Sequence, residues 1–81
     1  MGLFSYIKTT AVTVWHATGT CAMKPQASGG VVDSRLNVYG VSGLRIVDAS
    51  IMPVVTDQHP MGAVYMIAEK AAAMIKEDYG F

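Results

Sequence analysis

Two histidines, His16 and His59, are the side chains of this 81-residue sequence best suited to acid–base chemistry near neutral pH. His16 follows a β-prone run, residues 11–15, and opens a glycine-containing stretch that continues to Gly30. His59 directly precedes Pro60, where a helical pattern begins. Both histidines therefore lie at the edges of expected elements, where functional groups are usually presented. Position alone still favours the plainer interpretation, in which each is a partly exposed polar residue.

A zinc site built from His16, Cys21 and His59 is an alternative use for the same residues. It would have only the minimum of three protein ligands, and the spacing H-x4-C is not that of a familiar zinc finger. Cys21 is the only cysteine, so no internal disulfide can form. No flanking residue would activate it as a nucleophile, and isolated cysteines are usually small core residues. No metal site is therefore expected.

Several common functional motifs are absent from the sequence. It contains no GxGxxG dinucleotide loop, no P-loop and no serine nucleophile elbow. Six basic and six acidic residues give a net charge of zero, and the basic ones do not cluster. Nucleic-acid binding needs such a cluster, so it is not expected. No apolar run approaches the roughly 20 residues of a membrane span, so a membrane partner is not expected either.

The composition is unusually apolar for so short a chain. Hydrophobic residues make up 52% and charged residues 15%, whereas ordinary domains carry roughly 25% charged residues. A chain of this length buries only about 60–65% of the surface that its unfolded form exposes. We therefore expect it to pack against further protein or to form an oligomer. Alone, it should be partly unfolded or self-associated.

The best-defined expected element is a C-terminal helix. Apolar residues recur at helical spacing on one face: Val64, Ile67, Ala68, Ala71, Met74 and Ile75. Pro60 suits the first helical position, because its missing N–H costs nothing there, and His59 would then be the cap. Gly80 is a plausible end.

The rest of the chain predicts shorter elements. A short helix or turn is expected over residues 4–9, followed by an extended segment and then a loop from His16 to Gly30. Residues 31–32 and 36–39 favour short extended pieces. Residues 44–47 are apolar and β-branched except for Arg45, which indicates a buried strand whose edges would be exposed in isolation. The predicted fold class is an α/β fragment with short strands plus a C-terminal helix.

Four segments, in order, resemble one enzyme family. Trp-His-Ala-Thr-Gly-Thr-Cys-Ala-Met, residues 15–23, is similar to the catalytic-histidine segment of glucose–methanol–choline (GMC) oxidoreductases. Residues 29–33 with 38–41 resemble the next stretch of that family, and residues 44–53 resemble its last flavin-domain strand and turn. His59-Pro60 with residues 65–72 resembles its C-terminal helix. The resemblance covers residues 6–78.

The resemblance implies that the chain is the C-terminal piece of a two-domain FAD-binding oxidoreductase. Residues 6–36 would end the substrate domain, and residues 37–81 would return to the flavin domain. His16 would take the proton of an alcohol substrate, and His59 would assist beside the flavin. Flavin contacts are implied for Asp48, Ala49, Pro60 and Met61. Asn37 and Val38 match, more loosely, positions associated with oxygen access.

The resemblance also implies what the 81 residues would need to function. FAD would be the cofactor of the complete enzyme, but a chain without a dinucleotide loop is not expected to retain it alone. The implied partners are the missing N-terminal flavin-binding portion, or a complementary chain, and a small alcohol. The alternative is a truncated, non-catalytic remnant or a small interaction protein that cannot bind FAD by itself.

Overall fold

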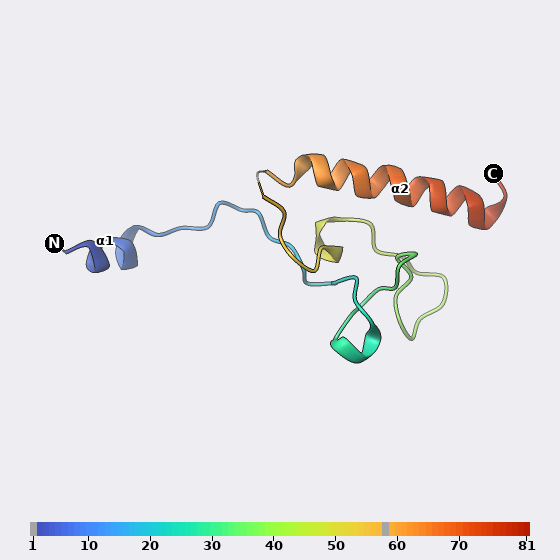
Figure 1. Cartoon of the computed structure of the whole chain (residues 1–81), viewed down its shortest axis with the longest axis horizontal. Helices are drawn as coiled ribbons and strands as arrows, with labels where there is room; N and C mark the ends of the chain where they lie inside the picture. The colour runs from blue at the N-terminus through green and yellow to red at the C-terminus, as the bar shows by residue number, and fades with distance from the viewer. Residues whose placement is uncertain (1, 58) are drawn as a thin grey trace.

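The computed structural model describes residues 2–57 and 59–81. Its elements are helix α1 (Leu3–Thr10), the 3-10 turns η1 (Gln26–Ser28) and η2 (Ala49–Ile51), and helix α2 (Met61–Tyr79). Helix α2 lies along an irregular loop region, and α1 extends away from both on an extended arm (Figure 1). The radius of gyration is 16.9 Å, against roughly 12 Å for a compact domain of this length. The molecule is therefore elongated.

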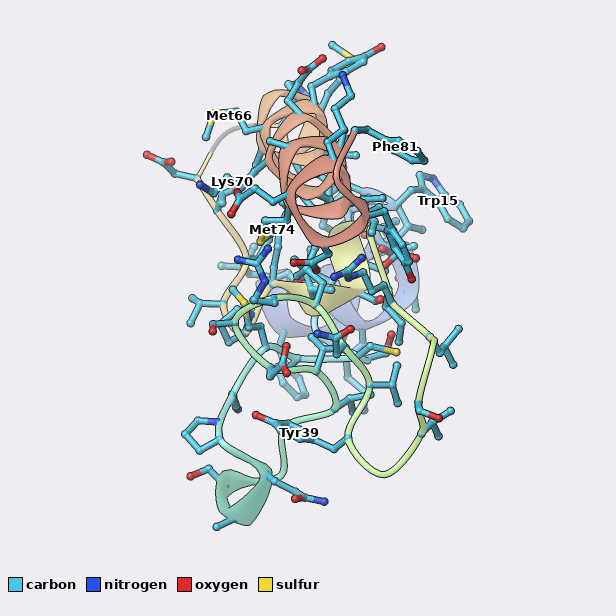
Figure 2. All side chains as sticks on the ribbon, turned by 90° about the vertical axis from the view of Figure 1, so that its right-hand side faces the viewer. Trp15, Tyr39, Met66, Lys70, Met74 and Phe81 are labelled. Carbon is cyan, nitrogen blue, oxygen red and sulfur yellow. The ribbon has the colours of Figure 1, made fainter. Side chains whose placement is uncertain are left out.

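A small core joins the C-terminal half of α2 to the loops. Its buried members are Val32, Leu36, Ile51, Ala71 and Met74. Figure 2 shows Met74 between α2 and the loop region. The expected apolar face of α2 is confirmed at Ala71 and Met74, whereas Ala68, assigned to the same face, is exposed. The loops cover only a narrow strip of the helix, so a residue at the edge of the apolar face stays in solvent.

The short strands that the sequence predicts are not confirmed. In the described part of the chain, β pairing consists of three isolated bridges: Met23 with Val32, Val32 with Val38, and Asn37 with Arg45. Residues 44–47 are not a buried strand, because Leu44 is 48% exposed and Arg45, Ile46 and Val47 are half-buried. A strand needs continuous pairing along an edge, and here only single residues find a partner. The expected α/β class is thus reduced to helices and loops.

An ion-pair cluster fixes the last turn of α2 to the loops. Arg35 donates to the Asp78 carboxylate at 2.9 Å and to the Met74 carbonyl oxygen at 3.3 Å. Arg45 pairs with the other oxygen of Asp78. Helix α2 then ends at Gly80, which has a φ of 75° and donates its N–H to the Lys76 carbonyl oxygen. The sequence predicted Gly80 as the end, but not the ion pairs.

Helix α1 confirms the short helix expected near residues 4–9, but none of its residues is buried. The arm after it is open as well, with Val12 and Val14 both mostly exposed. Helix α1 and the arm therefore make no contribution to the core.

No helix of the described residues is long and apolar enough to cross a membrane.

Candidate functional site

The two histidines singled out by the sequence lie side by side. Nδ1 of His59 is 3.3 Å from Nε2 of His16, although 43 positions separate them in the chain. Their ring centroids are 5.0 Å apart, and the ring planes meet at 88°. At this distance one nitrogen donates an N–H to the lone pair of the other, and the tautomers decide which one donates. The two rings can therefore share one hydrogen bond.

A backbone crossover brings these distant histidines together. The Cys21 N–H donates to the Ser50 carbonyl oxygen at 2.9 Å, and the Met23 N–H donates to the Ile51 carbonyl oxygen at 2.8 Å. The chain just after His16 is thereby fixed to the chain just before His59. Short loops from each side of the crossover then reach the pair.

Gly19 lies against the same crossover. It has a φ of 85°, and a Cβ at this position would lie 3.2 Å from the Met52 carbonyl oxygen. A side chain would therefore meet both a strained backbone and a close neighbour. Glycine allows the loop after His16 to pack closely against the segment that leads to His59.

Helix α2 begins directly beside the histidine pair. Pro60 is its N-cap rather than its first residue, and His59 lies one position before the cap, so both expectations were wrong by one residue. The first helical hydrogen bond runs from the Val64 N–H to the Pro60 carbonyl oxygen at 2.9 Å. The N-cap residue, Pro60, makes no side-chain capping hydrogen bond. The N–H groups of the first turn therefore lack helical partners and carry the positive end of the helix dipole.

A hollow of about 670 Å³ opens next to the two rings. It is lined by the histidine pair and the first turn of α2: His16, His59, Pro60, Met61, Val64 and Tyr65. Met61 and Tyr65 are each about two-thirds exposed, so the hollow is an open shelf rather than an enclosed cavity. Its lining is largely apolar, and the side chains with polar atoms are those of His16, His59 and Tyr65. This arrangement suits a partly apolar ligand that carries a few polar groups.

The structure brings together only some of the residues assigned to the site. Pro60 and Met61 line the hollow with the histidines, but Asp48 and Ala49 do not. The Asp48 carboxylate instead caps η2, accepting from the Ser50 N–H at 2.8 Å and from the Ser50 hydroxyl. The Ser50 carbonyl oxygen of η2 accepts the Cys21 N–H, so η2 lies beside the segment that follows His16.

Asn37, Val38 and Cys21 also lie outside the lining of the hollow. Asn37 and Val38 take part in isolated bridges within the loop region. In the described part of the chain, Cys21 and the histidines do not form a group of three metal-ligating side chains. The alternative of a zinc module therefore gains no support from the structure.

Sequence reasoning did not assign Tyr65 or Val64 to the site. With Met61 they recur at i, i+3 and i+4, which places all three on one face of α2. That spacing was a usable signal, but Val64 had been assigned to the core face. A second hollow of about 520 Å³, lined largely by methionine and other apolar side chains, shares no residue with the first.

Comparison with known proteins shows which family this chain is similar to. The family model described as GMC oxidoreductase matches residues 2–68. A GMC oxidoreductase family protein of Malassezia sympodialis is 48% identical over 88% of the chain, and an alcohol oxidase of Pichia angusta is 40% identical over 98%. An FAD-dependent oxidoreductase from Chaetomium thermophilum superposes with a TM-score of 0.83 at 40% identity over 85% of the chain. The chain spans 12–13% of the length of these three proteins.

Proposed function

The chain belongs to the GMC oxidoreductase family, and we propose that it supplies the acid–base histidines of an FAD-dependent enzyme that oxidises an alcohol. The observation that carries the proposal is the contact between His16 and His59 beside the open hollow at the start of α2. The names of its relatives point the same way, because they include an alcohol oxidase and an FAD-dependent oxidoreductase.

The roles of the two histidines follow from the chemistry of alcohol oxidation. A C–H bond of an alcohol carbon loses hydride readily only if the hydroxyl proton is lost as well. We assign that proton to Nε2 of His16, and we assign to His59 an N–H that donates to the alcohol oxygen as charge develops there. For both roles the alcohol oxygen would have to take the place of the direct contact between the two rings. When bound, FAD would accept the hydride, which is the chemistry of the cofactor rather than of the protein.

The start of α2 fits one edge of a flavin. The N–H groups of its first turn and its dipole would favour the electron-rich carbonyl edge of the ring system. Pro60 and Met61 would hold that edge, with the apolar shelf against the ring face. Contacts from Asp48 and Ala49 would have to come from the backbone or from the second Asp48 oxygen, because the first one caps η2.

The remaining part of FAD has to be held by other protein. The 81 residues contain no dinucleotide loop, so the diphosphate needs a flavin-binding portion, either N-terminal to this segment or on a complementary chain. The exposed apolar residues of α1 and the arm support such a partner, since they have nothing to pack against in this segment. In this proposal residues 6–36 close the substrate domain, and residues 37–81 return to the flavin domain.

The test is the rate of flavin reduction in an assembled FAD enzyme that contains this segment. His16→Ala should lower the rate of reduction by a small alcohol about 10²–10⁴-fold, the usual contribution of a general base. His59→Ala should cost less, because its hydrogen bond is only part of the stabilisation. Neither change should alter the amount of bound flavin, which serves as the control. Reduction of the His16→Ala enzyme at the unmodified rate, followed by stopped-flow absorbance, would contradict the proposal.

A further inference from the structure

The second hollow lies between helix α2 and the loops, away from the histidine pair. Its volume is about 520 Å³, and it shares no lining residue with the hollow beside the histidines. One wall is a face of α2, where Met66, Lys70 and Met74 recur at intervals of four residues and lie on one side of the helix (Figure 2). The loop residues of the other wall include Met23 and Met52. We name this hollow the methionine groove.

The methionine groove is an open continuation of the core. Met52 and Met74 are only 6% and 7% exposed, whereas Met66, in the same lining, is 70% exposed. Apart from two hydroxyl side chains and Lys70, the lining side chains are apolar. Methionine side chains are flexible, so they adapt to the shape of an apolar partner. The groove therefore suits an apolar segment that would cover Met66 and extend the core.

Lys70 is the one charged residue in the lining of the groove. The ion pairs of the described residues join Arg35 and Arg45 to Glu77 and Asp78, and none of them involves Lys70. An apolar segment laid over the groove would remove water from part of the Lys70 side chain. A charged group that loses water is stable only when an opposite charge or hydrogen bonds replace that water. The covering segment should therefore carry a carboxylate beside Lys70.

The need for a carboxylate decides between the possible occupants of the groove. Helix α1 is exposed and apolar, but residues 2–15, which comprise α1 and the arm, contain no Asp or Glu. The exposed N-terminal end, of this chain or of a second copy, therefore cannot supply both the apolar surface and the charge. The flavin-binding portion is the remaining occupant, since the 81 residues span only 12–13% of the length of three of their relatives.

We propose that the methionine groove binds an apolar segment of the flavin-binding portion, and that an aspartate or glutamate of that segment pairs with Lys70. The proposal rests on the proposed function for the presence of that portion. It assigns a second contact surface, on α2 and the loops, in addition to the exposed N-terminal end.

The first test is hydroxyl-radical footprinting of the assembled FAD enzyme that contains this segment. Met74 is buried within the segment itself, so it should be protected whenever α2 is folded, whereas Met66 is protected only if other protein covers the groove. We expect Met66 to oxidise at least about tenfold more slowly than in the same enzyme unfolded in denaturant, because oxidation follows exposure. A protected Met74 together with a Met66 that oxidises at the unfolded rate would overturn the proposal. Oxidation of both at that rate would overturn it as well, because the groove would not exist.

The second test identifies the occupant in the same assembled enzyme. A carbodiimide joins an amine to a carboxylate in contact with it, so peptide mass spectrometry should find Lys70 linked to an Asp or Glu of the flavin-binding portion. A link only to a second copy of the segment, or no link from Lys70, would contradict the proposed pair. Lys70→Glu should lower the temperature at which the enzyme releases FAD, followed by flavin fluorescence, by roughly 2 °C or more. Lys70→Arg is the matched control, because it keeps the charge, and equal release temperatures for the two variants would also contradict the pair.

None of these measurements depends on turnover, so the docking surface and the function can fail separately. If Met66 is protected but the His16→Ala enzyme reduces its flavin at the unmodified rate, the function fails and the docking stands. If flavin reduction depends on His16 but Met66 oxidises at the unfolded rate, the docking fails and the function stands.

Discussion

The histidines of the candidate site and the glycine beside them occupy positions where few other amino acids fit. Nδ1 of His59 and Nε2 of His16 lie 3.3 Å apart. Each histidine lies in a loop whose path is set by neighbouring residues rather than by the histidine side chain. Gly19 shows the same constraint, because its positive φ and the nearby Met52 carbonyl leave little room for a side chain. The chemistry of the site therefore depends on backbone positions as much as on the imidazoles.

Gly30 offers a direct test of a backbone constraint. A Cβ there would lie 2.5 Å from the Lys24 carbonyl carbon and closer still to its oxygen. Backbone atoms cannot move away as a flexible side chain could, so Gly30→Ala should lower the free energy of unfolding by about 1–3 kcal/mol. Gly2→Ala is the matched control, because nothing lies within 4 Å of its Cβ. Denaturant unfolding followed by circular dichroism would measure both, and equal stability of the two variants would contradict the assigned clash.

Helix α2 contributes Ala71 and Met74 to the buried core, and its methionines occupy both buried and exposed positions. Met74 is 7% exposed and belongs to the core, whereas Met66 is 70% exposed on the same helix. Met74→Ala should therefore destabilise the chain by about 2–3 kcal/mol through lost burial and a residual cavity. Met66→Ala should change stability by less than about 0.5 kcal/mol, as expected for the surface. Helix content against denaturant is the measurement, and a cost at Met66 as large as that at Met74 would refute this core.

The elements also show what could be read from the sequence and what could not. Helix α2 was predicted because its signal is local: an apolar period on one face and a glycine at the end. The strand over residues 44–47 was not formed, because pairing depends on a neighbouring edge that no local pattern specifies. The histidines were singled out by type and resemblance. The contact between the two histidines depends on the backbone hydrogen bond from Cys21 to Ser50. That bond joins distant parts of the chain, so a local sequence pattern does not predict it.

At the scale of the whole molecule, the surface is too large for an independent domain. The accessible area is 6213 Å², against roughly 4,700 Å² for a folded monomer of 8.6 kDa. Large apolar side chains are exposed at the N-terminal end, where Leu3, Phe4 and Val12 are each at least 74% exposed. Figure 1 shows this part of the chain standing away from α2 and the loops. We propose that further protein packs against this apolar surface.

Without such a partner, the exposed N-terminal end should make the purified chain self-associate. Phe4→Ser and Ile7→Ser together should shift sedimentation toward the monomer, since α1 then offers less apolar surface. Val41→Ser is the matched control, because Val41 is also exposed but lies directly after a turn, outside α1 and the arm. Sedimentation velocity over a range of concentrations measures the effect. A chain that stays monomeric at every concentration and unfolds in one sharp thermal transition would contradict this prediction. It would show that the small core stabilises the monomer and that the exposed arm does not cause association.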